Sequence, residues 1–235
     1  MILTIHQPEH MPWLGFFHKL DQVDLCVILD NVQYRQRYFQ NRNKIRNNNG
    51  WNWITVPVNA NRSSLIKDVT IASDHIWKRK WIKTIEHAYR KAPYADLYLQ
   101  GVLAVILQEW DKLSNLNIAL IELLCSYLGI KTRFCLASEM KLEGKGSELI
   151  LNICSVMGGA TYLSGISGKD YLQVSDFTEA GIEVIFQEFH HPIYKQLYEP
   201  FEPCMSVIDL LLNHGPASLE IIRGIGVPVM EELFL

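Results

Sequence analysis

The chain has 235 residues, of which 49% are hydrophobic and 20% are charged, and its formal net charge is −3. These proportions are typical of a folded globular protein rather than a disordered chain, and a chain of this length can fold without disulfides or a structural metal. The negative balance excludes attraction of the whole protein to nucleic acid or to an anionic membrane, but it leaves room for a local basic patch.

The cysteine pattern and the lack of targeting or membrane-spanning segments narrow the class of protein further. The five cysteines, Cys26, Cys125, Cys135, Cys154 and Cys204, are widely spaced and include no CxxC pair, so we expect small buried side chains rather than a zinc ribbon or a disulfide framework. The first residues lack the features of a signal peptide, and no apolar run is long enough to span a bilayer. The sequence therefore predicts a soluble cytoplasmic protein with no membrane span.

The first thirty residues predict a strand–helix–strand unit. Residues 2–5 and 25–29 are aliphatic runs that suit buried strands, and apolar residues recur at helical spacing over 13–20. Because the connection is short, we expect residues 2–7 and 25–30 to be neighbouring parallel strands, with the helix crossing between them.

The middle of the chain changes character twice. Over residues 34–58 arginines are interleaved with Tyr and Asn, and a turn at Asn47-Asn48-Asn49-Gly50 precedes an expected strand over 51–58, so this segment is predicted to be an inserted hairpin. Helical spacing then predicts a helical region over about 74–128, which is capped by Asp74, broken near 112–117 and closed by Gly129.

Alternation of strands and helices resumes in the last part of the chain. Strands are expected at 133–136, 162–164 and 182–189, with helices at 147–157 and from Ser206 onward. The sequence thus predicts one α/β domain over residues 1–235, built on a mostly parallel Rossmann-like sheet with the inserted hairpin and the helical middle region.

Four polar segments follow predicted strands, at the carboxyl ends where parallel α/β sheets bind ligands. They are residues 6–15, 30–46, 162–171 and 190–213, and we expect them to meet around one cleft. Within them, His6 and His10 are expected to line the reacting centre, and His191 is interpreted as the general base for an incoming amine or hydroxyl. The alternative for the first segment is a tight turn that docks Trp13 in the core.

The arginines of the second segment are candidates for holding phosphate, because guanidinium groups bind phosphate bidentately. Strand alternation predicts that Arg42 points into the cleft and that Arg35 is solvated, although a solvated hairpin face would explain the same pattern. Aromatic residues interleaved with them, Tyr34, Tyr38, Phe39 and Trp51, suit stacking on a base or sugar. The expected substrate-binding residues are Gln7, Trp13, Asp30, Gln33, Arg37, Asn41, Arg42, Arg46, Ser164, Gly165, Tyr194, Gln196, Asp209 and Asn213.

No motif predicts a cofactor or a metal ion. The Ser/Gly loop at 162–171 lacks the GxxxxGK[ST] pattern of a P-loop, and the pair His190-His191 lacks further ligands at zinc spacing. Since no GxSxG elbow is present either, direct transfer is favoured over a covalent intermediate.

These motifs together resemble the WbqC-like protein family. The resemblance extends from residue 2 to about residue 223, with Leu212 standing where Phe is expected, and Glu9 and His10 where an aromatic residue is frequent. It rests on Gln7-Pro8, Pro12-Trp13, Gly15-Phe16-Phe17, Asp30, Gln33-Tyr34, Asn41-Arg42-Asn43, Trp53, Thr55-Val56-Pro57-Val58, Tyr162-Leu163-Ser164-Gly165, His191-Pro192, Tyr194, Gln196, Ser206, Asp209 and Asn213.

The resemblance implies a bacterial cytoplasmic protein associated with O-antigen and other surface polysaccharide biosynthesis. It also implies a transferase that moves an acyl or aminoacyl group from an activated donor, which could be a charged tRNA, onto an amino sugar or small amine. It supplies no established catalytic residue. Two alternatives stay open: a nucleotidyltransferase-like enzyme that uses His10 and the arginines, and a non-catalytic module that binds RNA or a partner through the hairpin.

Overall fold

A computed structural model describes residues 1–74 and 76–230 and contains a parallel sheet of five strands in the order β7-β2-β1-β8-β9. These strands are β1 (Ile2–His6), β2 (Leu25–Ile28), β7 (Arg133–Leu136), β8 (Thr161–Ser164) and β9 (Glu183–Phe186). Every neighbouring pair in the sheet is parallel, which confirms the predicted α/β class. The predicted pairing of the first two strands is also confirmed, with α1 (Leu14–Leu20) connecting them.

The order of the strands creates a reversal beside β1. From β1 the chain proceeds outward through β2 to β7, and it then returns to place β8 and β9 on the other side of β1. The connections that follow β1 and β8 therefore leave the sheet in opposite directions, and a crevice forms between them at their carboxyl ends.

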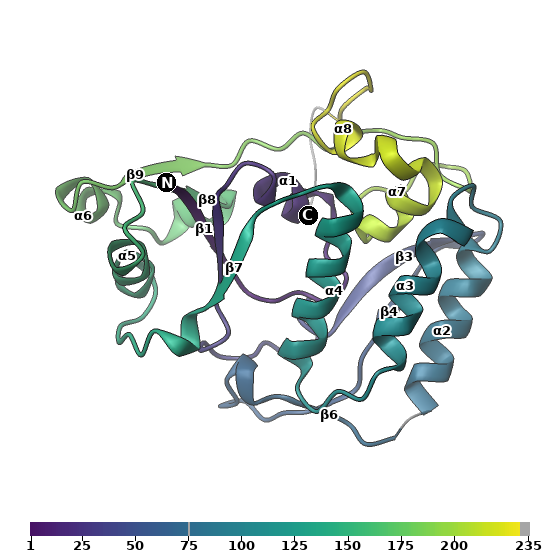
Figure 1. Ribbon diagram of the computed structural model, residues 1–235, viewed down its shortest axis with the longest axis horizontal. Coiled ribbons are helices and arrows are strands. Elements are labelled where there is room, and N and C mark those ends of the chain that lie inside the picture. Colours follow the sequence, from purple (N-terminus) through teal and green to yellow (C-terminus); the bar gives the residue numbers. More distant parts are fainter. Residues whose placement is uncertain (75, 231–235) are drawn as a thin grey trace.

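Each face of the sheet has its own hydrophobic core, because successive side chains of a strand point to opposite faces. Leu25 and Val27 pack with α5 (Ser147–Val156) and α6 (Val174–Glu179), whereas Cys26 and Ile28 face the larger core that includes α1 and α4 (Leu113–Leu128). Figure 1 shows α5 and α6 to the left of the sheet and α1 and α4 to its right.

The helical middle region ends where its sequence signals predict, but the break within it lies at residues 108–112 rather than near 112–117, because Leu113 already begins a helix. It consists of α2 (Ile76–Tyr89), α3 (Ala95–Leu107) and α4. The Asp74 carboxylate accepts a hydrogen bond from the Ile76 N–H at 2.8 Å, and Gly129 ends α4 with a φ of +78°, a conformation that glycine adopts without strain. Near the C-terminus, Ser206 caps α7 (Val207–His214), which precedes α8 (Ser218–Ile222).

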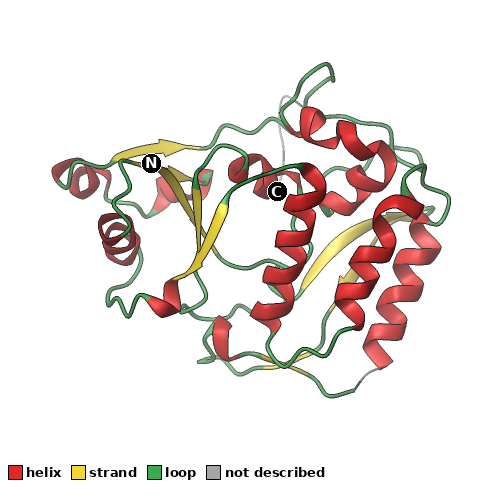
Figure 2. Ribbon diagram, viewed as in Figure 1, coloured by secondary structure: helices red, strands yellow, loops and turns green. Residues whose placement is uncertain are grey.

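The hairpin is shorter than its predicted range. Its strands are β3 (Arg42–Asn47) and β4 (Gly50–Thr55), and Figure 2 shows them beside the long helices on the right-hand side. The predicted strand over 51–58 is interrupted at Pro57, which has no N–H for the ladder. After this break β5 (Val58–Asn59) pairs with β6 (Thr70–Ile71) in a separate small sheet. Within the described residues, no helix combines the length and apolarity needed to cross a bilayer.

Candidate functional site

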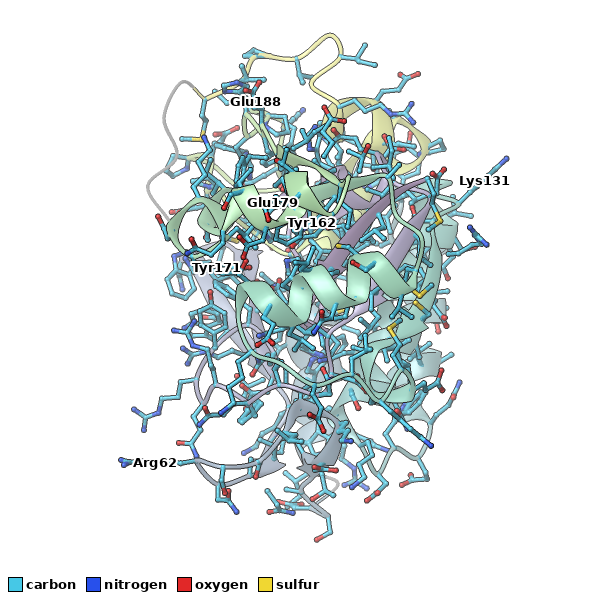
Figure 3. All side chains as sticks on the ribbon, turned by 90° about the vertical axis from the view of Figure 1, so that its left-hand side faces the viewer. Arg62, Lys131, Tyr162, Tyr171, Glu179 and Glu188 are labelled. Atoms are coloured by element: carbon cyan, nitrogen blue, oxygen red, sulfur yellow. The ribbon has the colours of Figure 1, made fainter. Side chains whose placement is uncertain are left out.

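A cavity of about 310 Å³ lies at the carboxyl ends of β1 and β8, at the reversal in strand order. Its polar lining consists of His6, Gln7, Glu9, Lys19, Arg35, Tyr38, Tyr162, Ser164, Ser167 and Tyr171, together with the backbone of Gly165 and Gly168. Figure 3 looks onto this half of the molecule with α5 in front, and it labels Tyr162 and Tyr171 of the lining. A larger hollow of about 810 Å³ lies between the hairpin, α2 and α3, but its ionisable side chains, such as Lys83 and Glu86, are exposed.

Two ionisable side chains of the cavity are buried and form no hydrogen bond or close ion pair with the described residues. Glu9 is 9% exposed and Lys19 is 4% exposed. The Glu9 Oε2 atom has no hydrogen-bond partner, and among the described residues the Lys19 ammonium forms neither a hydrogen bond nor an ion pair within 4.0 Å. Burying a charge without a partner is costly, so this arrangement suits a site whose ligand supplies the missing contacts.

Burial also brings the titration of these two groups close to neutral pH. It raises the pKa of Glu9 to about 7, an effect that the nearby Lys19 charge partly offsets. Burial lowers the pKa of Lys19 to about 8, and the negative charge of the nearby Glu9 carboxylate opposes that change. Near pH 7 the carboxyl group can therefore accept a proton while the ammonium group remains largely charged.

His6 presents a hydrogen-bond acceptor to the same cavity. Its Nδ1–H donates to the Gln7 carbonyl oxygen at 2.9 Å, which assigns the proton to Nδ1 and leaves the lone pair on Nε2. Burial, together with the Lys19 charge, lowers the pKa of His6 to about 3, so the ring is neutral. Nε2 has no partner among the described residues, and it can accept a hydrogen bond from a ligand.

A buried amide on α4 holds the two loops that carry these side chains. Asn117 Nδ2 donates to the carbonyl oxygens of Pro8 and Gln40, at 3.0 Å and 2.7 Å. The Gln40 side chain in turn donates to Gln7 Oε1 at 2.6 Å and accepts from the Arg35 N–H at 2.8 Å. The loop after β1 and the loop before the hairpin are thereby fixed against each other, and Arg35 is brought to the cavity.

Of the three histidines predicted to be catalytic, only His6 lines the cavity. The Trp81 N–H donates to His10 Nε2 at 3.1 Å, so Nδ1 of His10 carries the proton that Asn117 Oδ1 accepts. The Cys204 N–H donates to His191 Nε2 at 3.1 Å, and Nδ1 of His191 donates to the Pro192 carbonyl at 2.8 Å. Both rings are fully buried with each nitrogen engaged, so neither has a lone pair free for an incoming nucleophile.

The arginines are arranged differently from the sequence-based expectation. Arg46 is 1% exposed and does not line the cavity, and its guanidinium donates to Gln196 Oε1 and to the carbonyl oxygens of Asn47, Gly50 and Pro200. Arg42 packs its guanidinium over the Trp53 ring and does not line the cavity. Arg35, which was expected to be solvated, is exposed and yet forms part of the cavity lining.

The fourth predicted segment, residues 190–213, does not contribute to the cavity lining. Its polar residues converge instead on Asp209, which accepts hydrogen bonds from the Tyr194 hydroxyl at 2.8 Å and from Gln196 Nε2 at 2.9 Å. Asn213 donates to the Asp209 backbone carbonyl at 2.7 Å. Burial raises the pKa of Asp209 to about 6, although these hydrogen bonds oppose the change. This network joins α7 to the preceding loop.

The remaining predicted binding residues also make contacts within the protein. The Asp30 carboxylate accepts from the N–H and hydroxyl of Ser138, and Asn41 Nδ2 donates to the Val56 carbonyl. Gln33 donates to the Arg62 carbonyl, and Arg37 is exposed and accepts from Arg42 through its carbonyl oxygen. The Trp13 ring stacks on His191 and fills the space beside Gly15, where a Cβ atom would lie 2.4 Å from the indole. The structure therefore brings together four predicted residues, which are His6, Gln7, Ser164 and Gly165.

Glu9 and Lys19 are the functional candidates that the sequence analysis missed. The signal for Lys19 was available, because it lies three residues after Phe16 and four after Gly15, and so shares the buried face of a short helix. A lysine on such a face is unusual, since lysine is almost never fully buried. Glu9 gave a weaker signal, as a carboxylate in a turn otherwise occupied by histidines and prolines.

Fold and site together define a doubly wound α/β protein with a cavity and buried ionisable groups at the switch point of its sheet. Residues 7–221 match the model of the WbqC-like protein family. The chain is also 32% identical over 225 residues to "Uncharacterized protein Rv1507c" of Mycobacterium tuberculosis (strain ATCC 25618 / H37Rv), an alignment that covers 94% of this chain and 97% of that protein. No solved structure matches this chain. The chain belongs to the WbqC-like protein family.

Proposed function

We propose that this protein is a group transferase that moves an acyl or aminoacyl group from an activated donor onto the amine of an amino sugar or another small molecule. The observation that carries the proposal is the pair of buried side chains Glu9 and Lys19, which line one cavity at the carboxyl ends of β1 and β8, with Glu9 Oε2 buried and unpartnered among the described residues. A role of this protein in surface polysaccharide biosynthesis is implied by the family resemblance and forms part of the same proposal.

Glu9 is the general base of the proposed reaction. With a pKa of about 7, its carboxylate can take a proton from the attacking amine near neutral pH. General base catalysis is most efficient when the pKa of the base is close to the working pH. His6 is less suited to this role, because a pKa of about 3 makes Nε2 a weak base. We assign Nε2 to orienting the amine, by accepting one of its N–H groups.

Lys19 stabilises the negative charge that develops on the acyl oxygen. The amine nitrogen attacks the acyl carbon, and the carbonyl electron pair moves onto oxygen beside the Lys19 ammonium group. When that pair returns, the bond to the leaving group breaks and the leaving group departs with its electrons. The proton lost from the amine resides on Glu9. The C–N bond replaces the bond from carbon to the leaving group, and the N–H bond of the amine is replaced by an O–H bond on Glu9, so the step is balanced without a redox partner.

The experiment is a transfer assay in which an acceptor bearing a free amine, such as a nucleotide-linked amino sugar, is supplied with acyl-coenzyme A mixtures or charged tRNA. The amide product is detected by mass spectrometry. We expect Glu9→Gln to lower kcat by about 10²–10⁴-fold and Lys19→Met by about 10²–10³-fold. Glu179→Gln and Lys131→Met are the matched controls, since both residues are exposed and lie outside the cavity lining (Figure 3). Full activity of the Glu9 and Lys19 variants would refute the assignment of the site.

A further inference from the structure

A continuous strip of aromatic rings leads from the cavity along the hairpin. Tyr38 lies at the cavity, its ring centroid is 5.1 Å from that of Phe39, and Phe39 is 6.1 Å from Trp53. Trp53 in turn is 5.4 Å from Trp51. Tyr38 and Trp51, at the two ends of the strip, are each 38% exposed.

Cations accompany these rings along the whole strip. The Arg35 guanidinium lies 4.2 Å from the Tyr38 centroid, the Arg42 guanidinium lies 4.2 Å from the Trp53 centroid, and the Lys44 ammonium lies 4.6 Å from the Trp51 centroid. We call the four rings and three cations, Tyr38, Phe39, Trp51, Trp53, Arg35, Arg42 and Lys44, the hairpin strip.

The register of the hairpin explains why these side chains share one face. Lys44 pairs with Trp53 across the strands, so both side chains project to the same side. Their sequence neighbours Ile45 and Ile54 project to the other side, where both are buried in the core. The strip is therefore the outer face of a hairpin whose inner face is anchored.

The positive charge of the strip is not neutralised within the protein. The ion pairs found among the described residues join Lys78 to Glu109, Lys112 to Asp111 and Arg223 to Asp21, and none involves a cation of the strip. In addition, Arg42 Nε is buried and donates to no acceptor in the described part of the chain. Because the whole chain carries a net charge of −3, this is a local excess, and it favours an anionic ligand at this place.

Alternating rings and cations match the chemistry of a nucleotide. Aromatic side chains stack on bases with little regard to sequence, and Arg and Lys bind phosphate oxygens through charge-assisted hydrogen bonds. We infer that the hairpin strip binds the nucleotide part of the activated donor, with the reactive acyl end directed past Arg35 and Tyr38 to Glu9 and Lys19. This inference rests on the proposed function for the identity of that reactive end. Two donors share this chemistry, a coenzyme A thioester and the 3′ end of an aminoacylated RNA.

A binding experiment that needs no turnover tests the inference. The probes are adenosine 3′,5′-bisphosphate, which represents the coenzyme, and a fluorescent single-stranded oligoribonucleotide that ends in CCA. We expect at least one probe to bind at 50 mM salt and to bind more weakly as salt increases. Binding of the bisphosphate alone would indicate a coenzyme thioester, whereas binding of the oligonucleotide with at least 10-fold higher affinity would indicate RNA.

Variants of the strip then localise the binding. Arg42→Gln and Lys44→Gln should each weaken the bound probe at least 5-fold, and Arg42→Lys should retain most of the affinity. Arg79→Gln and Lys80→Gln, which remove exposed cations of α2, are the matched controls and should change affinity less than 2-fold. Equal losses in the strip and control variants, or no binding of either probe at 1 mM, would overturn the inference. Glu9→Gln should keep probe binding, so a failure of the proposed transfer chemistry would be seen separately.

Discussion

The ammonium nitrogen of Lys19 lies 3.8 Å from the position that a Cβ atom on Gly165 would occupy. Gly165 has a φ of −67° and a ψ of 162°, an extended conformation that any residue adopts. The backbone therefore does not require glycine here. What its missing side chain provides is space in the cavity beside Lys19, and this makes Gly165 a sensitive position at which to close the site.

Gly165→Val should fill that space without straining the backbone. We expect kcat/KM in the transfer assay to fall at least 10-fold, while the urea midpoint of unfolding stays close to that of the parent chain. Gly165→Ala adds one methyl group at ordinary van der Waals distance from Lys19 and should have an intermediate effect. Unchanged kcat/KM in the valine variant would mean that substrate does not enter beside Lys19.

The mutual influence of Glu9 and Lys19 can be measured without any substrate. Nuclear magnetic resonance of the lysine side-chain nitrogen should show Lys19 titrating at about 8, well below the ordinary lysine value. The Glu9 carboxylate raises the pKa of Lys19, so Glu9→Gln should move that pKa further down. Glu179→Gln serves as the control and should leave it in place. A lysine titration above 10 would show that the ammonium group is solvated rather than buried.

Glu9 should also make the protein less stable as pH rises. Its pKa is raised to about 7 in the folded chain, so between the ordinary glutamate pKa and about 7 the folded state retains a proton that the unfolded state has released. Stability is therefore lost as pH rises through this window. Because Glu9→Gln removes this titration, the stability of the variant relative to the parent chain should be greater at pH 7.5 than at pH 5. We expect this relative free energy of unfolding to rise by about 1–3 kcal/mol between the two pH values. Urea denaturation at the two pH values measures this difference, and a gain of similar size at both would contradict it.

His191 and His6 should respond oppositely to replacement. His191 is buried with both ring nitrogens bonded, so His191→Ala should lower the free energy of unfolding by about 2–4 kcal/mol. The fraction that remains folded should keep its kcat. His6→Gln should instead reduce transfer with little effect on stability, because His6 lines the cavity and its Nε2 has no partner among the described residues. If His191→Ala abolished kcat in fully folded protein, the general base would be His191, as the sequence predicted, rather than Glu9.

Local patterns in the sequence determined the secondary structure and the class of fold. Two aliphatic runs separated by a short helix are sufficient for the parallel pair β1 and β2, because only one crossover of that length packs well. The ends of α2 and α4 follow from Asp74 and Gly129, whose effects act within one helical turn. Four of the residues chosen for the site line the cavity because each ends or directly follows β1 or β8, and strand ends are visible in the sequence.

Only the tertiary structure decided which polar side chains are free. The sequence pattern does not distinguish His10 from His6, since both lie in the same polar segment after the first strand. In the fold, His10 bonds to the Asn117 amide, 107 residues away on α4, whereas Nε2 of His6 has no partner among the described residues. Arg46 and Arg42 share one face of a strand, yet the chain near Pro200 covers Arg46 alone. Glu9 and Lys19 have shifted pKa values because the folded chain buries both, in a cavity that β1 and β8 share. Propensity and alternation act over a few residues, whereas burial and hydrogen-bond partners depend on segments that meet only in the folded chain.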